Sequence, residues 1–477
     1  WLTEECDRRG IWIVFLFYNI HIPLPFAEKH GLPLLQNSID PLVARYTYET
    51  IAEFVRTYPN VGLMVCLGEA LRGTRDKTTW FTDTIIPAVK EGMRRGGLTE
   101  EPPLILRGHD CDPFDAIDKA ADLYDNLYTM WKYNGESLTT YFPIGNWQER
   151  HRQLSALKST HIINVHILAN LEPFRFNAPA FVQKCVQAGQ YRLGANGLHL
   201  YPLSYWDWPL SPDRAEPRLP QYVRDRIWYQ AWFRYAWQPH RDPEVERLYW
   251  IEVFAKQFQV TADDAASLLG ACESAAHCLP RILGRIGITE GNRQTLALGM
   301  TMSQLTNPVR YRPNLELWRS VARRGPQPID FIGDKLQGNP IIGETPEELI
   351  KDIDYFTAEA ERYLERFEEK TGLGDGLGRM IDDLRAVILL SRFYSHKLQS
   401  ALAVIEYREV MDGDFRGPTA LLDHALESLE NSVAVYRELT RLGTKRYLFA
   451  NSMQTRQRKI PFPDGSRYAH WKDCLPE

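Results

Sequence analysis

The chain has 477 residues, of which 44% are hydrophobic and 25% charged, an ordinary composition for a globular protein of two or three domains. Its net charge of −5 and sequence pI of about 6.2 give no electrostatic reason to expect nucleic-acid binding. No apolar run approaches the ~20 residues that a membrane-spanning helix needs.

The cysteines and the chain start say little about the compartment. The seven cysteines are scattered, odd in number and without a CxxC pair, so we predict neither a disulfide framework nor a zinc site. The sequence opens at Trp1 without a signal peptide, and we read it as a piece of a longer protein. A periplasmic or secreted location is slightly favoured over a cytoplasmic one.

Strand-like and helical segments alternate through the first 202 residues, which predicts parallel strands joined by helical crossovers. Residues 11–18, for example, form the continuous apolar run of a strand buried on both faces. The predicted strands are 11–18, 61–67, 103–107, 127–133, 161–171 and 197–202, and the helices between them are 41–58, 78–95, 113–125, 146–158 and 178–191.

Six such strands favour an α/β fold of the (β/α)8 TIM-barrel type, N-terminally truncated to six strands. If 197–202 is the last strand of the barrel, two strands lie upstream of Trp1, and 61–67 and 161–171 become the fourth and seventh strands. If the chain is complete, an open doubly wound sheet is the alternative.

From about residue 221 the sequence predicts helices alone. We therefore expect a partial catalytic barrel over 1–220 and an all-α C-terminal domain over 221–477. The Pro- and Gly-rich segment 304–345 is predicted as a long ordered connection. The expected helices are 221–257, 262–283, 291–303, 346–370, 377–411 and 418–442.

Polar residues follow the predicted strands, where a barrel builds its active site. Asn19 and His21 follow the first strand and are candidates to bind hydroxyls, although a lone histidine is more often structural. Glu69 ends the second strand, where an apolar barrel mouth disfavours the charged form of a carboxylate and so suits a general acid. Its structural alternative is pairing with Arg72 or Arg75. Strand alternation places on one side Val61, Leu63, Val65, Leu67 and Glu69.

The third strand ends in a second polar cluster. Arg107 and His109 share a side as candidate substrate ligands, and Asp110 is a candidate base. Asp112 precedes Pro113, the residue types that begin a helix, so we expect it to be an N-cap.

Lys132, Asn134 and Glu136 alternate onto one face at the end of the fourth strand. A cation and an amide suit a substrate carboxylate, while Lys132 paired with a structural acid is the alternative. Glu136 is a third candidate catalytic carboxylate.

The fifth strand carries polar residues on one side, which is unfavourable in a buried strand unless they bind a ligand or one another. Glu172 at its end is a candidate catalytic carboxylate, and Arg175 either neutralises it or holds an acidic substrate. The residues that share this side are Asn164, His166, Leu168, Asn170 and Glu172.

Aromatic residues follow the last strand. Trp206 lies in a loop at the expected barrel mouth and is a candidate for stacking on a sugar. Trp228, Trp232 and Tyr235 have the i, i+4, i+7 spacing of a buried helical stripe. For His199 on the last strand we expect a structural role.

On these residues the chain resembles glycoside hydrolases with a (β/α)8 barrel and a helical C-terminal domain, especially the α-glucuronidases of families 67 and 115. In those enzymes an acid glutamate ends the fourth strand and a base carboxylate the seventh, which look like Glu69 and Glu172 here. The stretch Lys132-Tyr133-Asn134-Gly135 and the run Trp232–Pro239 are also similar. Family 67 has an Asp after the Asn-Gly motif where this chain has Glu136, so the base and the linkage stay open.

The resemblance implies a glycoside hydrolase that cleaves a polysaccharide or oligosaccharide and releases a uronic acid such as glucuronic acid, with inversion. Glu69 would be the acid, and Glu172, Glu136 or Asp110 would activate water. We expect a carbohydrate substrate, no nucleic-acid or membrane partner and, because HxH and HExxH spacings are absent, no metal or cofactor. A homodimer through the helical domain is left open.

Two alternatives belong to other classes. A metal-dependent barrel isomerase or hydrolase would draw its ligands from the His, Asp and Glu residues at the strand ends. A non-catalytic glycan-binding barrel would use the same pocket without hydrolysis.

Overall fold

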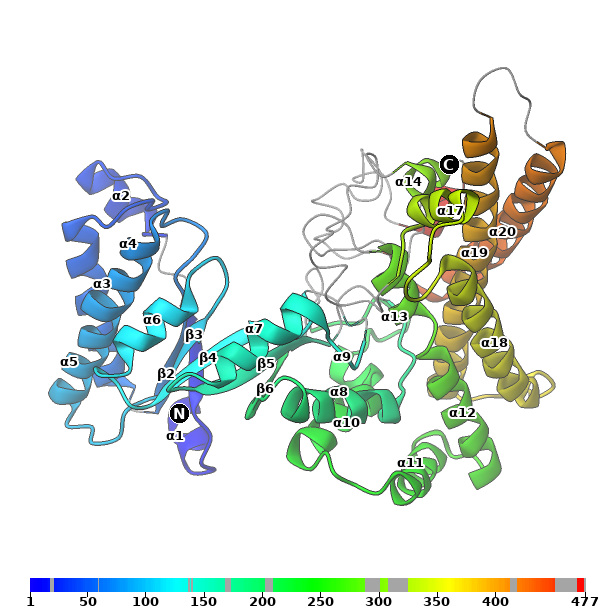
Figure 1. Ribbon diagram of the computed structural model, residues 1–477. Helices are drawn as coiled ribbons and strands as arrows, with labels where there is room; N and C mark the ends of the chain where they lie inside the picture. Colours follow the sequence, from blue (N-terminus) through cyan, green and yellow to red (C-terminus); the bar gives the residue numbers. More distant parts are fainter. Residues whose placement is uncertain are drawn as a thin grey trace. The chain divides into compact units, whose positions relative to one another are not determined.

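The computed structural model (Figure 1) forms two compact units. The first contains Trp1–Lys132, Gln148–Asn164 and Gly189–His199, and the second Tyr133–Trp147, Val165–Ala188 and Leu200–Glu477. The structure describes residues 1–17, 21–58, 60–135, 138, 140–167, 173–201, 209–287, 301–307, 325–411, 418–450 and 470–475.

Six parallel strands form a half-barrel in which every strand lies beside its neighbours in the sequence, in the order β1-β2-β3-β4-β5-β6. A doubly wound sheet reverses its strand order at a switch point. This order does not reverse, so the doubly wound alternative is wrong. The strands are β1 (Ile13–Phe17), β2 (Val61–Cys66), β3 (Leu104–Arg107), β4 (Leu127–Lys132), β5 (Thr160–His166) and β6 (Gly197–Tyr201).

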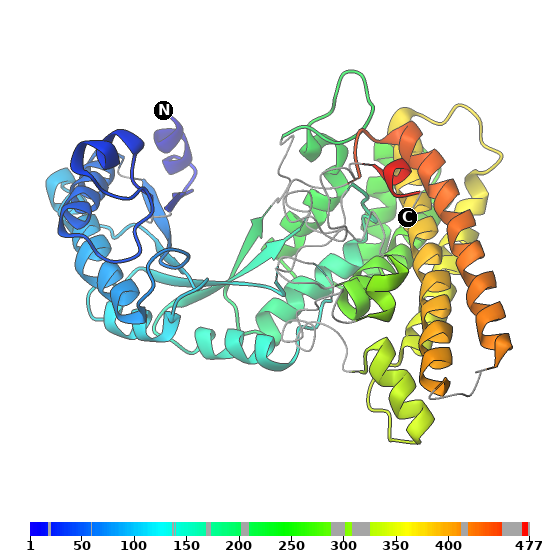
Figure 2. The ribbon, with the colours of Figure 1, turned by 90° about the horizontal axis from the view of Figure 1, so that it is seen from above.

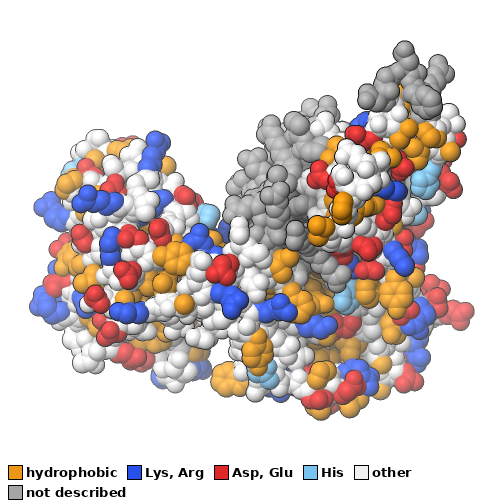
Figure 3. All heavy atoms as spheres, viewed as in Figure 1, with side chains coloured by type: hydrophobic (Ala, Val, Ile, Leu, Met, Phe, Trp, Pro, Cys, Tyr) orange, Lys and Arg blue, Asp and Glu red, His pale blue; other side chains and the backbone are white. Residues whose placement is uncertain are grey.

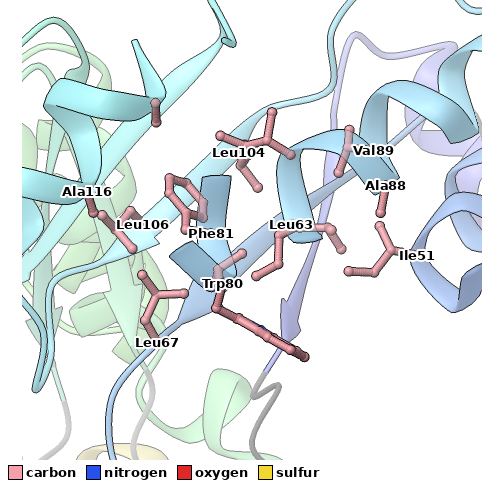
Figure 4. Packing of buried hydrophobic residues seen from close by; sticks show 14 of the residues in the cluster. Ile51, Leu63, Leu67, Trp80, Phe81, Ala88, Val89, Leu104, Leu106 and Ala116 are labelled. Carbon is pink, nitrogen blue, oxygen red and sulfur yellow. The ribbon is translucent and has the colours of Figure 1, made fainter. Parts of the chain in front are cut away.

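The helices of the first unit cover one face of its strands. Leu63 of β2 pairs in register with Leu104 of β3, which pairs with Leu127 of β4. In Figure 4, side chains from β2 and β3 pack against Trp80, Phe81 and Val89. The covering elements are α3 (Pro41–Thr57), α4 (Thr74–Thr79), the π-helix η1 (Trp80–Ile85), α5 (Ile86–Gly96) and α6 (Pro113–Ala120).

Two of these helices begin as their residue types predict. Asp40 accepts hydrogen bonds from the backbone N–H groups of Leu42 and Val43 at 2.8 and 3.1 Å. Asp112 does the same for Phe114 and Asp115, which confirms it as the N-cap of α6. The remaining helices of the half-barrel are α1 (Leu2–Asp7), α2 (Leu24–His30), α7 (Gly145–Ser155) and α8 (Pro179–Tyr191).

After β6 the described elements are helices. The stretch predicted as one helix over 221–257 is broken at Asp225 and again after Trp237, where Pro239 prevents continuation and Asp242 caps a new helix that begins at Pro243. A helix also lies in the segment predicted as a connection, α17. The elements are α9 (Gln221–Arg224), α10 (Arg226–Trp237), α11 (Pro243–Phe258), α12 (Ala262–Ala275), α13 (Leu279–Ile282), η2 (Leu283–Gly287), α14 (Met302–Thr306), α17 (Pro328–Gln337), α18 (Pro346–Leu364), η4 (Glu365–Phe367), α19 (Asp375–Val410), α20 (Thr419–Arg446) and α22 (Trp471–Cys474).

The long helices α19 and α20 pack side by side along much of their length (Figure 2). Ser400 of α19 donates to the carbonyl of Ala425 at 2.7 Å, and Ser432 of α20 donates to the carbonyl of Phe393 at 3.1 Å. Serine side chains of each helix therefore reach the backbone of the other.

The core of the second unit combines aromatic rings with a buried ion network. Trp228, Trp232 and Tyr235 are 1% exposed or less, which confirms the predicted core stripe. Arg224 is buried and contacts three aspartates: its Nε lies 2.8 Å from Asp213, its Nη1 2.6 Å from Asp225 and its Nη2 2.7 Å from Asp383. The predicted domain boundary at residues 220 and 221 stays a prediction.

The visible surface over α3 and α5 carries interspersed acidic and basic side chains rather than a field of one sign (Figure 3). Within the described ranges, no helix is both long and apolar enough to span a membrane.

Candidate active site

Glu69 lies in the turn that follows β2, on a strained backbone. Its φ angle is 75°, in the left-handed region that non-glycine residues rarely occupy. Its backbone N–H donates to Asp110 Oδ2 at 3.0 Å, and its Oε1 lies 3.1 Å from Nε2 of His109. The Glu69 side chain is 44% exposed. Strain that is held in place by specific contacts is common at functional sites.

The turn after β3 supplies these partners. Asp110 also has a left-handed backbone, with φ of 51°. Lys77 of α4 is buried, donates to the backbone carbonyl of Asp110 and places its Nζ 3.9 Å from Oδ2 of Asp110. Asp110 therefore joins Lys77 to the backbone of Glu69. Our sequence interpretation missed Lys77, because a lysine in a polar helical segment carries no signal of such a role.

Gly68 allows the two turns to approach each other. A Cβ at this position would lie 2.5 Å from the carbonyl oxygen of His109 and 2.5 Å from Cβ of Asp110. No side chain fits in that space, so glycine is required here by contact rather than by its φ angle.

The neighbourhood of His109 is biased toward positive charge. Burial lowers the pKa of His109, and so do Lys132 and Arg107, whereas Glu69 and Asp110 act in the opposite direction. The imidazole is therefore neutral at neutral pH. A neutral imidazole beside Glu69 can share a proton with it, and two cations nearby can attract an anionic ligand.

Arg107 belongs to the face of the half-barrel opposite the helices. Leu106 packs in the helix-facing core, so the next side chain, Arg107, points the other way, with its Nη1 4.0 Å from Sγ of the paired Cys66. On β4, Trp131 contacts Arg150 of α7, so Lys132 lies on the same inner face as Arg107.

Asn164 and His199 extend this inner face. Asn164 Nδ2 contacts His199 Nδ1 and lies 3.8 Å from Sδ of Met130. Burial and the nearby Arg107 lower the pKa of His199. We expected only a structural role for His199. It lies on the strand next to the predicted polar stripe of β5, and this position could have indicated that it contacts Asn164 on the inner face.

The predicted alternation is confirmed for Leu63, Val65 and Leu67, which share one side, but it does not extend to Glu69. Leu63, Val65 and Leu67 belong to the core beneath the helices, so they do not face the barrel interior. Glu69 does not continue their row, because β2 ends at Cys66 and the left-handed backbone turns Glu69 toward His109.

Three other candidates have surroundings of their own. His21 is exposed and forms an isolated bridge with Leu35. In the second unit, Asn134 is fully buried, and His166 packs its ring against Tyr201 with centroids 4.8 Å apart.

Arg175 is 4% exposed and its Nε contacts Asp225 Oδ2 at 3.1 Å. This places it in the buried ion network, and we do not carry it forward as a substrate ligand. Five predicted residues lie outside the described part of the chain: Asn19, Glu136, Asn170, Glu172 and Trp206.

The metal alternative draws on His, Asp and Glu at the strand ends. Within the described residues, no group of three or more His, Cys, Asp or Glu side chains is arranged as a set of metal ligands.

Comparison with solved structures is informative about the family of this chain. No family model and no curated protein matches the sequence. A solved structure described as a "GH138 enzyme targeting pectin rhamnogalacturonan II" is 40% identical, with a TM-score of 0.92, covering 100% of this chain and 69% of that chain. The match supports a glycoside hydrolase, whereas the resemblance to α-glucuronidase families 67 and 115 is not supported. The chain belongs to glycoside hydrolase family 138.

Proposed function

We propose that this glycoside hydrolase acts on a complex pectic polysaccharide, such as rhamnogalacturonan II, and releases a uronic acid from it. The observation that carries the proposal is Glu69 on its left-handed backbone, held by His109 and Asp110 beside two cations. The pectic substrate class is suggested by the 40% identical enzyme, which targets pectin rhamnogalacturonan II.

The cations support an anionic sugar. Arg107 and Lys132 both lower the pKa of His109, so both lie close enough to act on a charge placed there. Charge-assisted hydrogen bonds from such groups to a carboxylate are roughly twice as strong as neutral ones. A uronate would gain from this field, whereas a neutral hexose would not.

In the proposed mechanism, Glu69 donates its proton to the glycosidic oxygen as the bond from that oxygen to the anomeric carbon breaks. A water molecule forms the new bond to the anomeric carbon and gives its proton to a second carboxylate. Glu172 and Glu136 are the proposed bases. Asp110 is better placed to orient Glu69, because its Oδ2 already accepts from the Glu69 backbone. Inversion requires carboxyl groups about 6.5–9.5 Å apart.

We also propose that the half-barrel is part of a (β/α)8 fold. The sequential strand order and the one-sided helix layer of the first unit are those of such a barrel, and Glu69, His109 and Asp110 follow the carboxyl ends of their strands.

The test compares wild-type protein with Glu69→Gln, Glu136→Gln and Glu172→Gln on rhamnogalacturonan II oligosaccharides, para-nitrophenyl uronides and the matching neutral hexosides. Glu53→Gln is the control, because Glu53 is an exposed residue of α3 whose side chain contacts Arg56 and Thr57 of the same helix. The proposal expects release of a uronic acid that is abolished in Glu69→Gln and in one of the other two variants, with the product anomer read by NMR. Undiminished hydrolysis by Glu69→Gln, or release of neutral sugars only, would refute it.

A further inference from the structure

A chain of hydrogen bonds runs through the buried side of β4 in the first unit and ends on the backbone of Lys132. His151 Nε2 lies 3.0 Å from the carbonyl oxygen of Lys132, and His151 Nδ1 lies 2.9 Å from Nε2 of His161. His161 Nδ1 lies 3.0 Å from Oγ1 of Thr129, to which Ser159 donates at 3.5 Å. Both imidazoles and Thr129 are 1% exposed or less.

The direction of this chain follows from its last acceptor. A carbonyl oxygen only accepts, so Nε2 of His151 carries the hydrogen. In a neutral ring the Nδ1 atom then accepts, and Nε2 of His161 donates to it. By the same reasoning Nδ1 of His161 accepts from the hydroxyl of Thr129. Burial lowers the pKa of His161 to about 4, although a hydrogen bond to the backbone of Thr129 acts in the opposite direction, and the low pKa keeps the imidazole neutral.

The chain of hydrogen bonds connects three elements to the carbonyl oxygen of Lys132. His151 belongs to α7, His161 to β5 and Thr129 to β4, and all three side chains lie on the helix-covered face. Arg150 of the same helix lies 5.4 Å from the ring centroid of Trp131, so α7 is packed directly against the end of β4. Lys132 is the last residue of that strand, and its side chain points to the opposite, inner face.

We propose that His151 and His161 are positioning residues that fix the backbone of Lys132, and so hold its ammonium group where an anionic sugar binds. The inference rests on the proposed function only in taking Lys132 as a substrate ligand. Neither histidine touches the substrate. Their effect passes through the carbonyl of Lys132, because a strand end that is held by a hydrogen bond from a buried helix has fewer orientations for its side chain.

The kinetic test uses His151→Phe, which fills the space of the imidazole but cannot donate to Lys132. Loss of one buried hydrogen bond of about 1.4 kcal/mol corresponds to about tenfold. We expect KM for a para-nitrophenyl uronide to rise about tenfold with little change in kcat, because binding of the carboxylate contributes equally before and during the reaction. His151→Gln, which can place an amide donor near the same carbonyl, should restore much of the affinity.

Two controls separate positioning from stability. Leu154→Ala removes a fully buried side chain from the same helix without touching the chain of hydrogen bonds, so it should lower Tm and leave KM unchanged. Lys132→Met should raise KM for the uronide but not for the neutral hexoside. If Lys132→Met raises KM and His151→Phe does not, the inference is overturned and the proposed function stands. If Lys132→Met has no effect, the inference is overturned together with the role of Lys132, while Glu69→Gln still tests glycosidase activity.

A measurement that needs no turnover completes the test. Nitrogen-15 NMR of the histidine rings in the resting protein should show both His151 and His161 neutral with hydrogen on Nε2. The ring nitrogen chemical shifts of His161 should change in His151→Phe. Hydrogen on Nδ1 of either ring would overturn the inference. If no hydrolysis is detected, calorimetry can measure Kd for the same uronide in Glu69→Gln and in the double variant that also carries His151→Phe. The ratio of the two Kd values then replaces the ratio of KM values. Equal Kd values would overturn the inference.

Discussion

Replacing Gly68 with alanine should damage the site through a single methyl group. The added Cβ would lie 2.5 Å from the carbonyl oxygen of His109 and from Cβ of Asp110, whereas ordinary contact begins at 3.4 Å. Both neighbours belong to the turn after β3, so that turn must retreat by about 0.9 Å, the difference between these distances. A displacement of about 1 Å in an active site costs about 100-fold in rate. Overpacking of this kind also lowers the free energy of unfolding by about 1–3 kcal/mol.

The assay measures hydrolysis and urea unfolding of Gly68→Ala beside Gly333→Ala. Gly333 lies within α17, and a Cβ placed there meets no atom within 4 Å beyond its chain neighbours and the backbone of its own helix, so its substitution should be neutral or slightly stabilising. We expect kcat/KM of Gly68→Ala to fall about 100-fold, a larger loss than the modest decrease in stability would produce in the folded fraction. Wild-type kcat/KM in Gly68→Ala would refute the argument that Glu69 depends on the close approach of the two turns.

Three further predictions concern buried ionisable groups. Arg224→Met leaves three buried aspartates without their shared cation and should lower the free energy of unfolding by roughly 3–5 kcal/mol. Urea denaturation measures this loss, with Arg247→Met, at an exposed arginine, as the control. Equal effects of the two substitutions would contradict the prediction. Burial raises the pKa of Glu273 to about 7 from 4.5, so its contribution to stability is lost as pH rises through 7, and Glu273→Gln should raise Tm at pH 8 but not at pH 5. Burial lowers the pKa of His161 to about 4 from 6.5, so the unfolded chain takes up this proton first as pH falls. Roughly 3 kcal/mol should be lost between those two values, and urea curves from pH 7 to pH 4 should show a weaker pH dependence in His161→Gln.

The strands could be predicted well from the sequence because their signal is local. The run predicted at 61–67 is observed as Val61–Cys66, and 197–202 as Gly197–Tyr201, since both segments are short and bounded by turn-forming residues, as strands are. Proline positions indicate helix ends, and we used this information at Pro113, which follows Asp112. We did not use it at Pro239, so residues 221–257 were predicted as one helix.

The site was only partly predictable, for a reason that Glu69 illustrates. Its importance follows from its position after a strand, but its direction depends on a left-handed backbone that alternation cannot anticipate. Lys77 and His151 were missed because each acts across a distance in sequence, on Asp110 and Lys132, through contacts that only the fold creates. The resemblance to known hydrolases gave the right enzyme class, but the families that it named, 67 and 115, are not supported.

The sequential strand order has a consequence for how the chain acquires its structure during synthesis. Ile13 pairs with Val61, 48 positions later, and Leu104 pairs with Leu127, only 23 positions later. Each strand thus meets its partner soon after leaving the ribosome, and closing such modest loops is entropically less demanding than joining distant segments. The sheet can grow one strand at a time from β1 towards β6, so that each new strand pairs before the next is complete and few unpaired strands are exposed to aggregation at any moment.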